Sequence, residues 1–515
     1  MIFDLHPHTS LKPFLSNIDP DKKTSCWSII NVCNLLNKVA DNRLDSQSCL
    51  SQMKGGGEIL AVPALYAMER EIASTLTVRI IDLISTKISN GLLKKIRDRE
   101  PGYGYIDLIK GELQHFRKAA NERPGELTFL KKGDSLDPAD LNGKINVIFA
   151  IEGGHALLDT ETVQEFDYDS DEKIAIVINR FETFLDDNAD LTFLFLTLTH
   201  IAQGPFCNQS FAYPNFTENI STKNFLPRSL VGINKAGWQV IQKCRDRNIL
   251  IDIKHMSYVS RCQYYKYLID TNGSIFPPFA SHMGCAGISF KHVEALWAKQ
   301  YEYKNCDKIN VPRSQGLMGT KFSPLTLSLF DEEIKYIVDA NGLIGLSLDD
   351  RILGYKKKDD SCDTEYIYTD EFDYLKGDDY DTDFGFLKAS VTGIDYHSTF
   401  PYSTPSNLDD IHALYFCNNL LRIVYAGGIN AWGCVCLGSD YDGLIVAIEC
   451  CKTANDFEYF RTKVLYWLPI MMKTVENYGS IFYVDESDLA NDINQKVNKV
   501  FFENGRQFLK RILHS

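Results

Sequence analysis

The sequence of 515 residues lacks any uninterrupted run of about 18 apolar residues, which is the length that a helix needs to cross a membrane. It also lacks the charged segment and apolar segment of a signal peptide at its start, because "IFDLH" follows Met1 directly. These absences argue against a membrane-spanning protein and predict a cytoplasmic one with no membrane partner.

Basic residues are scarce relative to acidic ones, with 54 Lys and Arg against 68 Asp and Glu, so the formal net charge is −14. No basic stripe is present to meet phosphates, which argues against a nucleic-acid partner. The 14 cysteines include only two close groupings, "CVC" at 434–436 and "CC" at 450–451. Neither has the spacing of a zinc finger or a redox motif, so reduced, buried thiols are expected.

The chain contains eight short apolar runs that end in polar or ionisable residues. These runs are "IFDLH" (2–6), "EILAVPAL" (58–65), "INVIFAIEGGH" (145–155), "LTFLFLTLTH" (191–200), "NILIDIKH" (248–255), "PPFASH" (277–282), "LIGLSLDD" (343–350) and "CVCLGSD" (434–440). Amphipathic helical patterns at 68–98, 234–248, 331–341, 408–428 and from about 456 onward alternate with them. Eight such strands predict the α/β class and a closed (β/α)8 TIM barrel.

Three stretches interrupt this alternation, at about 159–173, 291–330 and 354–405. The first and third are acidic, and the third is also rich in Tyr. We interpret all three as loop insertions, so that residues 1–515 form a single barrel domain. The third insertion is expected to be solvated or to act as a lid. A calcium site there is the weaker alternative, because the Gly-bearing spacing of a calcium loop is missing.

Ionisable residues gather where the apolar runs end, and all these ends open on one face of a barrel, where active sites of this fold lie. The residues are His6 with His8, Glu152, His200, His255, His282 and Asp440, and they include five of only 11 histidines. His6 and His8 are two apart on a strand and point to the same side. A solvated N-terminal pair is the alternative for these two. Burying the whole set is costly unless a cation binds it, so a metal site is predicted.

The chemistry of this set fits a two-metal hydrolase, in which a carboxylate bridges two Zn²⁺ or similar divalent ions and a further carboxylate moves a proton. Asp440 is the natural candidate for the proton carrier. Asp442, two residues further on, is expected to serve as a turn residue or as an acceptor behind the site. His155 is expected to be structural or to lie behind the ligands. The five histidines without context, His115, His292, His397, His412 and His514, are expected at the surface or in structural roles.

Five blocks in order along the chain carry a resemblance to a known family: "IEGGHAL" (151–157), "LTLTH" (196–200), "IDIKHMS" (251–257), "SH" (281–282) and "GSDYDG" (438–443). They resemble the signature blocks of the membrane (renal) dipeptidase family, peptidase family M19, in the amidohydrolase superfamily of metal-dependent barrels. The resemblance covers residues 1 to about 450 apart from the insertions. It implies hydrolysis of dipeptides and related small amides, with two zinc ions, and a homodimeric assembly.

The resemblance also implies a role for each residue. Glu152 would bridge the two zinc ions, with His6 and His8 on one and His255 and His282 on the other. His200 would contact the substrate and steady the tetrahedral intermediate. Asp440 would be the catalytic acid and base, touching the first metal.

The sequence departs from the family pattern at three places. His8 stands where the family has Asp, which leaves the site less negative by about one charge. Leu327 and Ser328 stand where the family has an Arg-Asn pair that holds the substrate carboxylate, and Arg313 is the candidate replacement. Lys254 stands where the family tends to have a small residue.

Two other functions are compatible with parts of the sequence. "DLHPHT" (4–9) also resembles the opening of the PHP phosphoesterases, which hydrolyse phosphate esters on a trinuclear site, although "GSDYDG" lacks the second His of their final block. A barrel with an altered site that acts as a binding protein is the non-enzymatic alternative. It would lack the bridging or the acid residue, and both are present here.

Overall fold

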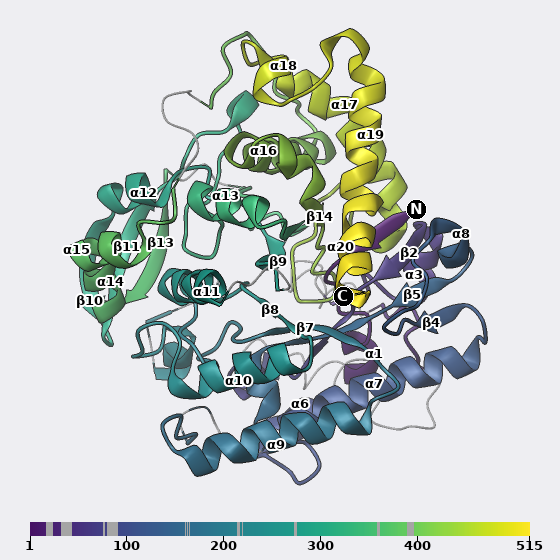
Figure 1. Ribbon diagram of the computed structural model, residues 1–515, viewed down its shortest axis with the longest axis vertical. Coiled ribbons are helices and arrows are strands. Elements are labelled where there is room, and N and C mark those ends of the chain that lie inside the picture. The colour runs from purple at the N-terminus through teal and green to yellow at the C-terminus, as the bar shows by residue number, and fades with distance from the viewer. Residues whose placement is uncertain are drawn as a thin grey trace.

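A computed structural model describes the chain except for residues 17–23, 32–43, 76–77, 80–90, 160, 162, 164, 214–216, 219, 272–275, 358–360, 389–395 and 515, and the side chains of 220 and 221. Strands and helices alternate along most of the chain (Figure 1). Among the described residues, none of the helices is both long and apolar enough to span a membrane.

The main sheet is parallel and consists of short strands. They are β1 (Ile2–Asp4), β2 (Glu58–Ala61), β3 (Ala64–Tyr66), β4 (Leu127–Phe129), β5 (Ile145–Val147), β6 (Phe149–Glu152), β7 (Phe193–Thr197), β8 (Leu250–Asp252), β9 (Phe279–Met283), β12 (Leu343–Leu346) and β14 (Val435–Leu437). Each of the eight predicted apolar runs overlaps at least one of them. In four runs the strand ends two or three residues before the ionisable residue, at His6, His200, His255 and Asp440, whereas Glu152 and His282 lie within their strands.

The main sheet closes on itself as a barrel. β1 pairs with β2 on one side and with β14 on the other, so the first and last strands of the sheet are neighbours. β2 and β3 are two halves of one strand, because Val62 donates to Asp4 and Ala64 to Pro7 across the break at Pro63, which has no N–H. β5 and β6 are likewise two halves, with Ile148 donating to Ala61 and Ala150 to Pro63. Counting each pair once, eight strands form the ring, and β4 lies outside it against β5.

Most of the helices surround this ring, whereas α12, α14 and α15 lie beside it (Figure 1). They are α1 (Leu11–Ser16), α3 (Leu50–Gly55), α4 (Arg70–Ala73), α6 (Leu92–Asp98), α7 (Tyr105–Glu122), α8 (Pro138–Leu141), α9 (Asp171–Asp187), α10 (Lys235–Asp246), α11 (Tyr258–Asp270), α12 (Phe290–Leu296), α13 (Asp331–Asp339), α14 (Thr369–Lys376), α15 (Asp378–Phe384), α16 (Leu408–Gly427), α17 (Phe457–Met472), α18 (Tyr478–Ile481), α19 (Leu489–Asn498) and α20 (Asn504–Leu513). α10 packs on β8 and α13 on β12, as the strand–helix alternation requires. The prediction of one continuous helix over 68–98 is wrong near the start of that range, because α4 ends at Ala73.

Two of the predicted insertions meet in a second, antiparallel sheet. It contains β10 (Ala298–Tyr303), β11 (Cys306–Pro312) and β13 (Cys362–Tyr368), and it lies beside the barrel with α12, α14 and α15 (Figure 1). The sequence predicted loops for these segments. The described part of the remaining predicted insertion, 159–173, holds no strand, and α9 begins at Asp171.

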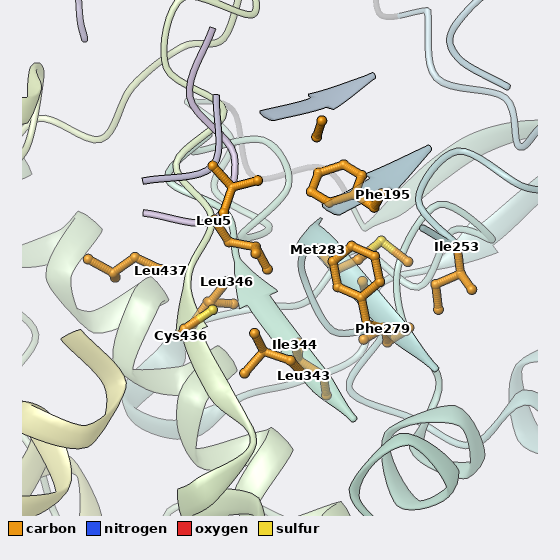
Figure 2. Packing of buried hydrophobic residues seen from close by; sticks show 14 of the residues in the cluster. Leu5, Phe195, Ile253, Phe279, Met283, Leu343, Ile344, Leu346, Cys436 and Leu437 are labelled. Carbon is orange, nitrogen blue, oxygen red and sulfur yellow. The ribbon is translucent and has the colours of Figure 1, made fainter. Parts of the chain in front are cut away.

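Apolar side chains fill the barrel below its open face (Figure 2). The Phe195 and Phe279 rings pack 4.9 Å apart, and the His6 ring stacks on Phe195 at 5.8 Å. Strands approach very closely here, since a Cβ at Gly345 or Gly438 would lie within 2 Å of the Ser281 carbonyl oxygen. The apolar filling therefore provides a dry, closely packed floor beneath His6.

Candidate metal and catalytic site

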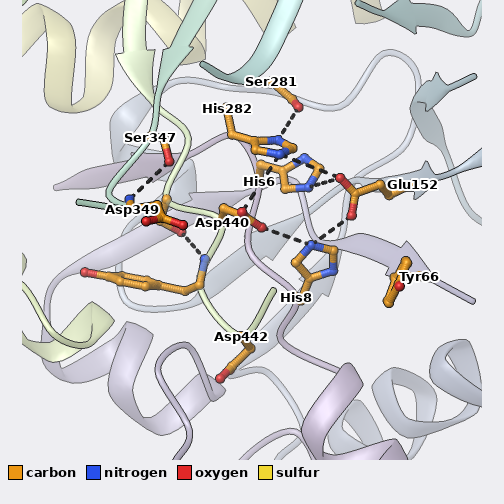
Figure 3. A network of polar contacts seen from close by, with 12 residues as sticks. His6, His8, Tyr66, Glu152, Ser281, His282, Ser347, Asp349, Asp440 and Asp442 are labelled. Carbon is orange, nitrogen blue, oxygen red and sulfur yellow. Dashed lines mark hydrogen bonds and ion pairs between the residues drawn. The ribbon is translucent and has the colours of Figure 1, made fainter. Parts of the chain in front are cut away.

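The carboxyl ends of the barrel strands bring the predicted residues together (Figure 3). Glu152 is the last residue of β6 and His282 lies within β9. The others follow their strands by two or three residues: His6 after β1, His200 after β7, His255 after β8 and Asp440 after β14. Burial is nearly complete for four of these side chains, whereas His200 is 11% and Asp440 14% exposed. Residues far apart in the sequence thus share one small volume.

Glu152 is at the centre of the group. Its Oε1 lies 3.3 Å from His6 Nε2, 3.5 Å from His255 Nε2 and 3.7 Å from His282 Nε2. Its Oε2 lies 3.1 Å from His8 Nε2 and 3.7 Å from His200 Nε2. Both carboxylate oxygens therefore face imidazole nitrogens, from different sides of the barrel.

Three overlapping groups have the composition and spacing of metal ligands: His6, Glu152 and His282; His6, His8 and Asp440; and Glu152, His200 and His255. Both ring nitrogens of His6, His8 and His255 are buried and make no hydrogen bond within the described part of the chain, and neither does Glu152 Oε1. Buried polar atoms are nearly always satisfied in folded proteins, so this set lacks a partner of the kind that a divalent cation supplies. The residues fit such an ion.

The charges inside the site depend strongly on one another. Burial would raise the pKa of Glu152, but the imidazoles of His200, His6 and His8 hold that pKa well below its ordinary value. Burial would lower the pKa of His8, but Glu152 and Asp440 raise it to about 10. His8 Nε2 faces both carboxylates, at 3.1 Å from Glu152 Oε2 and 3.4 Å from Asp440 Oδ1, in the place where a cation would compete with a proton. Burial lowers the pKa of His255 to about 3, which keeps this imidazole neutral and able to bind metal.

Asp440 lies at the mouth of the site. Its Oδ1 is 3.4 Å from His8 Nε2 and its Oδ2 is 3.9 Å from His282 Nε2. Its backbone is in the left-handed region (φ 61°), as is that of His255 (φ 66°). Non-glycine residues rarely adopt this conformation, and it is found preferentially at functional sites. Burial raises the pKa of Asp440 above its ordinary value.

A hydrogen-bond chain behind His282 fixes its tautomer. The Ser281 hydroxyl donates to Asp252 Oδ2 at 2.6 Å, so it accepts from His282 Nδ1 at 2.7 Å. Asp252 also accepts from the Ser281 and Lys254 backbone N–H groups and the Thr197 hydroxyl. Nδ1 therefore carries the proton, and His282 Nε2 presents a lone pair to the site, as in metal-bound histidines.

Glu69, at the N-terminus of α4, is a residue that the sequence did not identify. Its Oε1 accepts from His200 Nδ1 at 2.6 Å, and its Oε2 accepts from the Tyr66 hydroxyl. Burial would raise the pKa of Glu69, but the charges of His200 and His155 and these hydrogen bonds hold it at about 2. Glu69 is thus an ionised carboxylate that aims His200 Nε2 at Glu152. Its position just before a short helix gave no signal in the sequence, because its partner lies 131 residues away.

Two cations stand beside the carboxylates. Arg351, after β12, makes a bidentate ion pair with Asp349 (Nε to Oδ1 2.9 Å). Lys254, between Asp252 and His255, is 1% exposed, and its Nζ has no hydrogen-bond partner among the described residues. Burial lowers the pKa of Lys254 to about 8, against the opposing effect of Asp440, Asp252, Asp349 and Glu152.

Arg313 is not among the side chains that gather around Glu152. It follows β11 on the small sheet, where its guanidinium contacts Asp363 (3.6 Å) and the Gly354 carbonyl oxygen. The backbone carbonyl of Ser328 accepts from the buried Arg261. The predicted role of Arg313 in holding a substrate carboxylate stays a prediction.

Asp442 and His155 lie behind the site, as expected. Asp442 binds Lys12 Nζ (2.6 Å) and the backbone N–H groups of Gln47 and Ser48, and so fastens the segment before α3. His155 Nε2 is 2.6 Å from the Ala67 carbonyl oxygen. His412, expected at the surface or in a structural role, is 2% exposed and lies in α16.

No family model and no curated protein matches the sequence. Among solved structures, the chain is similar to metallopeptidases and dipeptidases, one of which, the dipeptidase AC, is described as a member of peptidase family M19. One is a metallopeptidase from Rhodobacter sphaeroides with a phosphinate mimic of the dipeptide L-Ala-D-Ala (13% identity, 99% of each chain, TM-score 0.48). Another is the dipeptidase AC (13% identity, 100% of this chain and 99% of that chain, TM-score 0.49). A third is the probable dipeptidase PvdM from Pseudomonas aeruginosa (13% identity, 100% and 95%, TM-score 0.47). At such identities the activity has to be argued from the site itself.

Proposed function

We propose that this chain is a binuclear metal-dependent hydrolase that cleaves a dipeptide or a related small amide. The observation that carries the proposal is Glu152, whose two oxygens face five imidazoles in a buried site with unpartnered nitrogens. A carboxylate with nitrogen ligands on both sides suits a bridge between two ions, and neutral imidazoles with carboxylates suit Zn²⁺.

In this proposal His6, His8 and Asp440 would hold one ion, His255 and His282 would hold the other, and Glu152 would bind both. Divalent ions held there would lower the pKa of a water molecule and polarise the scissile carbonyl. The protein supplies the fixed donors, the orientation of His282 through Ser281 and the apolar floor that keeps bulk water out.

Asp440 and His200 carry out the steps that belong to the chain itself. Asp440 takes the proton of the attacking water and delivers it to the amide nitrogen as the C–N bond breaks, so that a carboxylate and an amine leave. His200, held by Glu69, directs Nε2 towards the carbonyl oxygen as negative charge develops on it. The partial exposure of Asp440 places this proton carrier where a substrate can reach it.

The first test combines elemental analysis of the purified protein with a screen of L,L-, L,D- and N-blocked dipeptides. We expect about two zinc ions per chain and cleavage of free dipeptides. Glu152→Gln is expected to release metal. Asp440→Asn is expected to keep most of the metal but to lose turnover by orders of magnitude.

Other outcomes would change the proposal in defined ways. Two metals without dipeptide cleavage would contradict the peptidase activity and direct the screen to other amides and to phosphate esters. No bound metal after repletion would contradict the hydrolase altogether. Full activity of Asp440→Asn on a confirmed substrate would exclude Asp440 as the proton carrier.

A further inference from the structure

His255 adopts a backbone conformation that a residue with a side chain rarely adopts. Its φ of 66° lies in the left-handed region, and such residues persist only where the surrounding structure enforces the conformation. The hydrogen bonds that do so here involve the backbone from His255 to Ser257. They come from two parts of the chain outside the barrel strands.

The loop that follows β7 pairs with the backbone of 255–257. The Ser210 N–H donates to the His255 carbonyl oxygen at 2.8 Å, and the Ser210 hydroxyl donates to the Met256 carbonyl oxygen at 2.8 Å. The Ser257 N–H donates to the Asn208 carbonyl oxygen at 2.9 Å. Residues 208–210 therefore lie alongside 255–257, and the turn at His255 depends on their position.

Glu371, in α14 beside the small sheet, joins this loop to the start of α11. Its side chain is buried, and its Oε1 accepts from the Ser257 hydroxyl at 2.8 Å and from the Gly232 N–H at 2.9 Å. Both donors are neutral. Burial raises the pKa of Glu371 to about 7, against the opposing effect of its hydrogen bonds with Gly232, Ser257 and Asn208. Glu371 is therefore needed here as a hydrogen-bond acceptor, and an uncharged acceptor of the same shape should replace it.

Glu365, in β13, provides a second contact between the small sheet and the same loop. It is fully buried and accepts from the Thr326 N–H at 3.0 Å and from the Thr326 hydroxyl. That hydroxyl lies 3.2 Å from the hydroxyl of Ser210, whose N–H donates to His255. The small sheet thus supports both segments that pair around His255.

We infer that the small sheet is a positioning element for His255 and that Glu371 is the positioning residue through which it acts. This inference rests on the proposed function, in which His255 would bind a metal ion. The segments of the small sheet leave the barrel after β9 and β12, at the carboxyl ends of the strands, where the site lies. Removing the acceptor at 371 leaves the Ser257 hydroxyl and the Gly232 N–H without a buried partner, and this weakens the support of the turn at His255.

The first test is a double-mutant cycle with zinc alone as the probe. Zinc chloride is titrated by calorimetry into metal-free wild-type protein and Glu371→Met, each with and without His255→Ala. We expect Glu371→Met to weaken one of the two zinc sites about tenfold or more, and to leave the zinc that His255→Ala still binds within about twofold, because Glu371 acts only through His255. Glu371→Gln keeps the acceptor and should stay close to the wild type. Asp373→Met, at an exposed residue of the same helix, is the matched control and should change neither site.

Hydrogen exchange of the metal-free protein separates this inference from the proposed function. The Ser210 N–H, which donates to His255, should exchange about tenfold faster or more in Glu371→Met than in the wild type or Glu371→Gln. The Ile344 N–H, which donates to Cys434 between two barrel strands, should be unchanged. If the wild type binds no zinc but this difference is found, the proposed function fails and the positioning of His255 stands. If Glu371→Met weakens both zinc sites equally and accelerates both amides, or if it alters neither, Glu371 does not position His255.

Discussion

At the scale of single residues, Asp440 occupies space that is free only because Gly443 has no side chain. A Cβ at Gly443 would lie 2.1 Å from Asp440 Oδ1 and 2.9 Å from a ring carbon of His8. Gly443→Ala is therefore expected to displace both groups and to lower kcat about a hundredfold, because small displacements of catalytic groups are that costly. The measurement is steady-state kinetics beside a thermal melt. Gly433→Ala is the matched control, since nothing lies within 4 Å of a Cβ there. Equal activity of the two variants would contradict the assignment.

The second prediction at this scale concerns Glu69, the carboxylate behind His200. Glu69→Gln removes the charge that orients the imidazole, so kcat is expected to fall about 10- to 100-fold with little change in KM. Tyr66→Phe deletes the hydroxyl on the other oxygen but keeps the Glu69–His200 contact, and its effect is expected to be smaller. A Glu69→Gln variant whose loss lies entirely in KM, or whose folded fraction accounts for the loss, would show that Glu69 does not position His200.

At the scale of elements, the eight barrel strands could be predicted because each is an apolar run that ends in a polar residue. The small sheet could not. Residues of β10 are almost all exposed, so the segment has no alternation of apolar and polar residues, and its partner β11 pairs in turn with β13 from another insertion. Glu69 was missed for the same physical reason, since its function arises only when β7 and α4 meet in space. The candidate metal-binding residues could be recognised in the sequence because imidazoles and carboxylates are rarely buried unless they bind a cation or another partner.

The prediction for elements concerns the ion pair that joins α11 to α13. Arg261 and Glu333 are both fully buried, and Arg261 Nη1 also donates to the Met256 and Thr326 carbonyls. Arg261→Met leaves the Glu333 charge buried and unpaired, so the free energy of unfolding is expected to fall by about 3–5 kcal/mol. Denaturant titration measures it. Arg261→Met combined with Glu333→Leu should recover part of the loss, and Lys94→Met, at an exposed pair, should change less than about 0.5 kcal/mol. No recovery in the double variant would contradict this account.

At the scale of the whole molecule, the barrel joins the beginning of the chain to residues far along it, because β1 lies between β2 and β14. The site is complete only when residues from His6 to Asp440 are in place. Global stability and the site are therefore linked, and conditions that unfold the barrel also dismantle the site. The homodimer that the resemblance implies stays a prediction.

Acid should destabilise the whole molecule through buried neutral histidines, of which His412 is the clearest outside the site. Burial lowers the pKa of His412 from 6.5 to about 4, and its Nδ1 accepts from the Glu449 backbone N–H at 2.7 Å, which requires an unprotonated nitrogen. Below pH 6.5 the unfolded chain binds a proton here that the folded chain does not. The contribution of His412 to the free energy of unfolding is therefore constant above pH 6.5. It falls by about 1.4 kcal/mol per pH unit as the pH drops towards 4, and then levels off.

Replacing His412 tests this directly. His412→Gln keeps an acceptor for the Glu449 N–H but cannot titrate, so its free energy of unfolding should fall less steeply than that of the wild type between pH 6.5 and 4. Denaturant titrations of the metal-free protein at several pH values give the two slopes. The exposed His514, replaced in the same way, is the control and should leave the slope unchanged. Each buried histidine contributes separately to the change of the free energy of unfolding with pH. If His412→Gln does not alter this change between pH 6.5 and 4, the acid sensitivity comes from other buried groups, and the account of His412 is wrong.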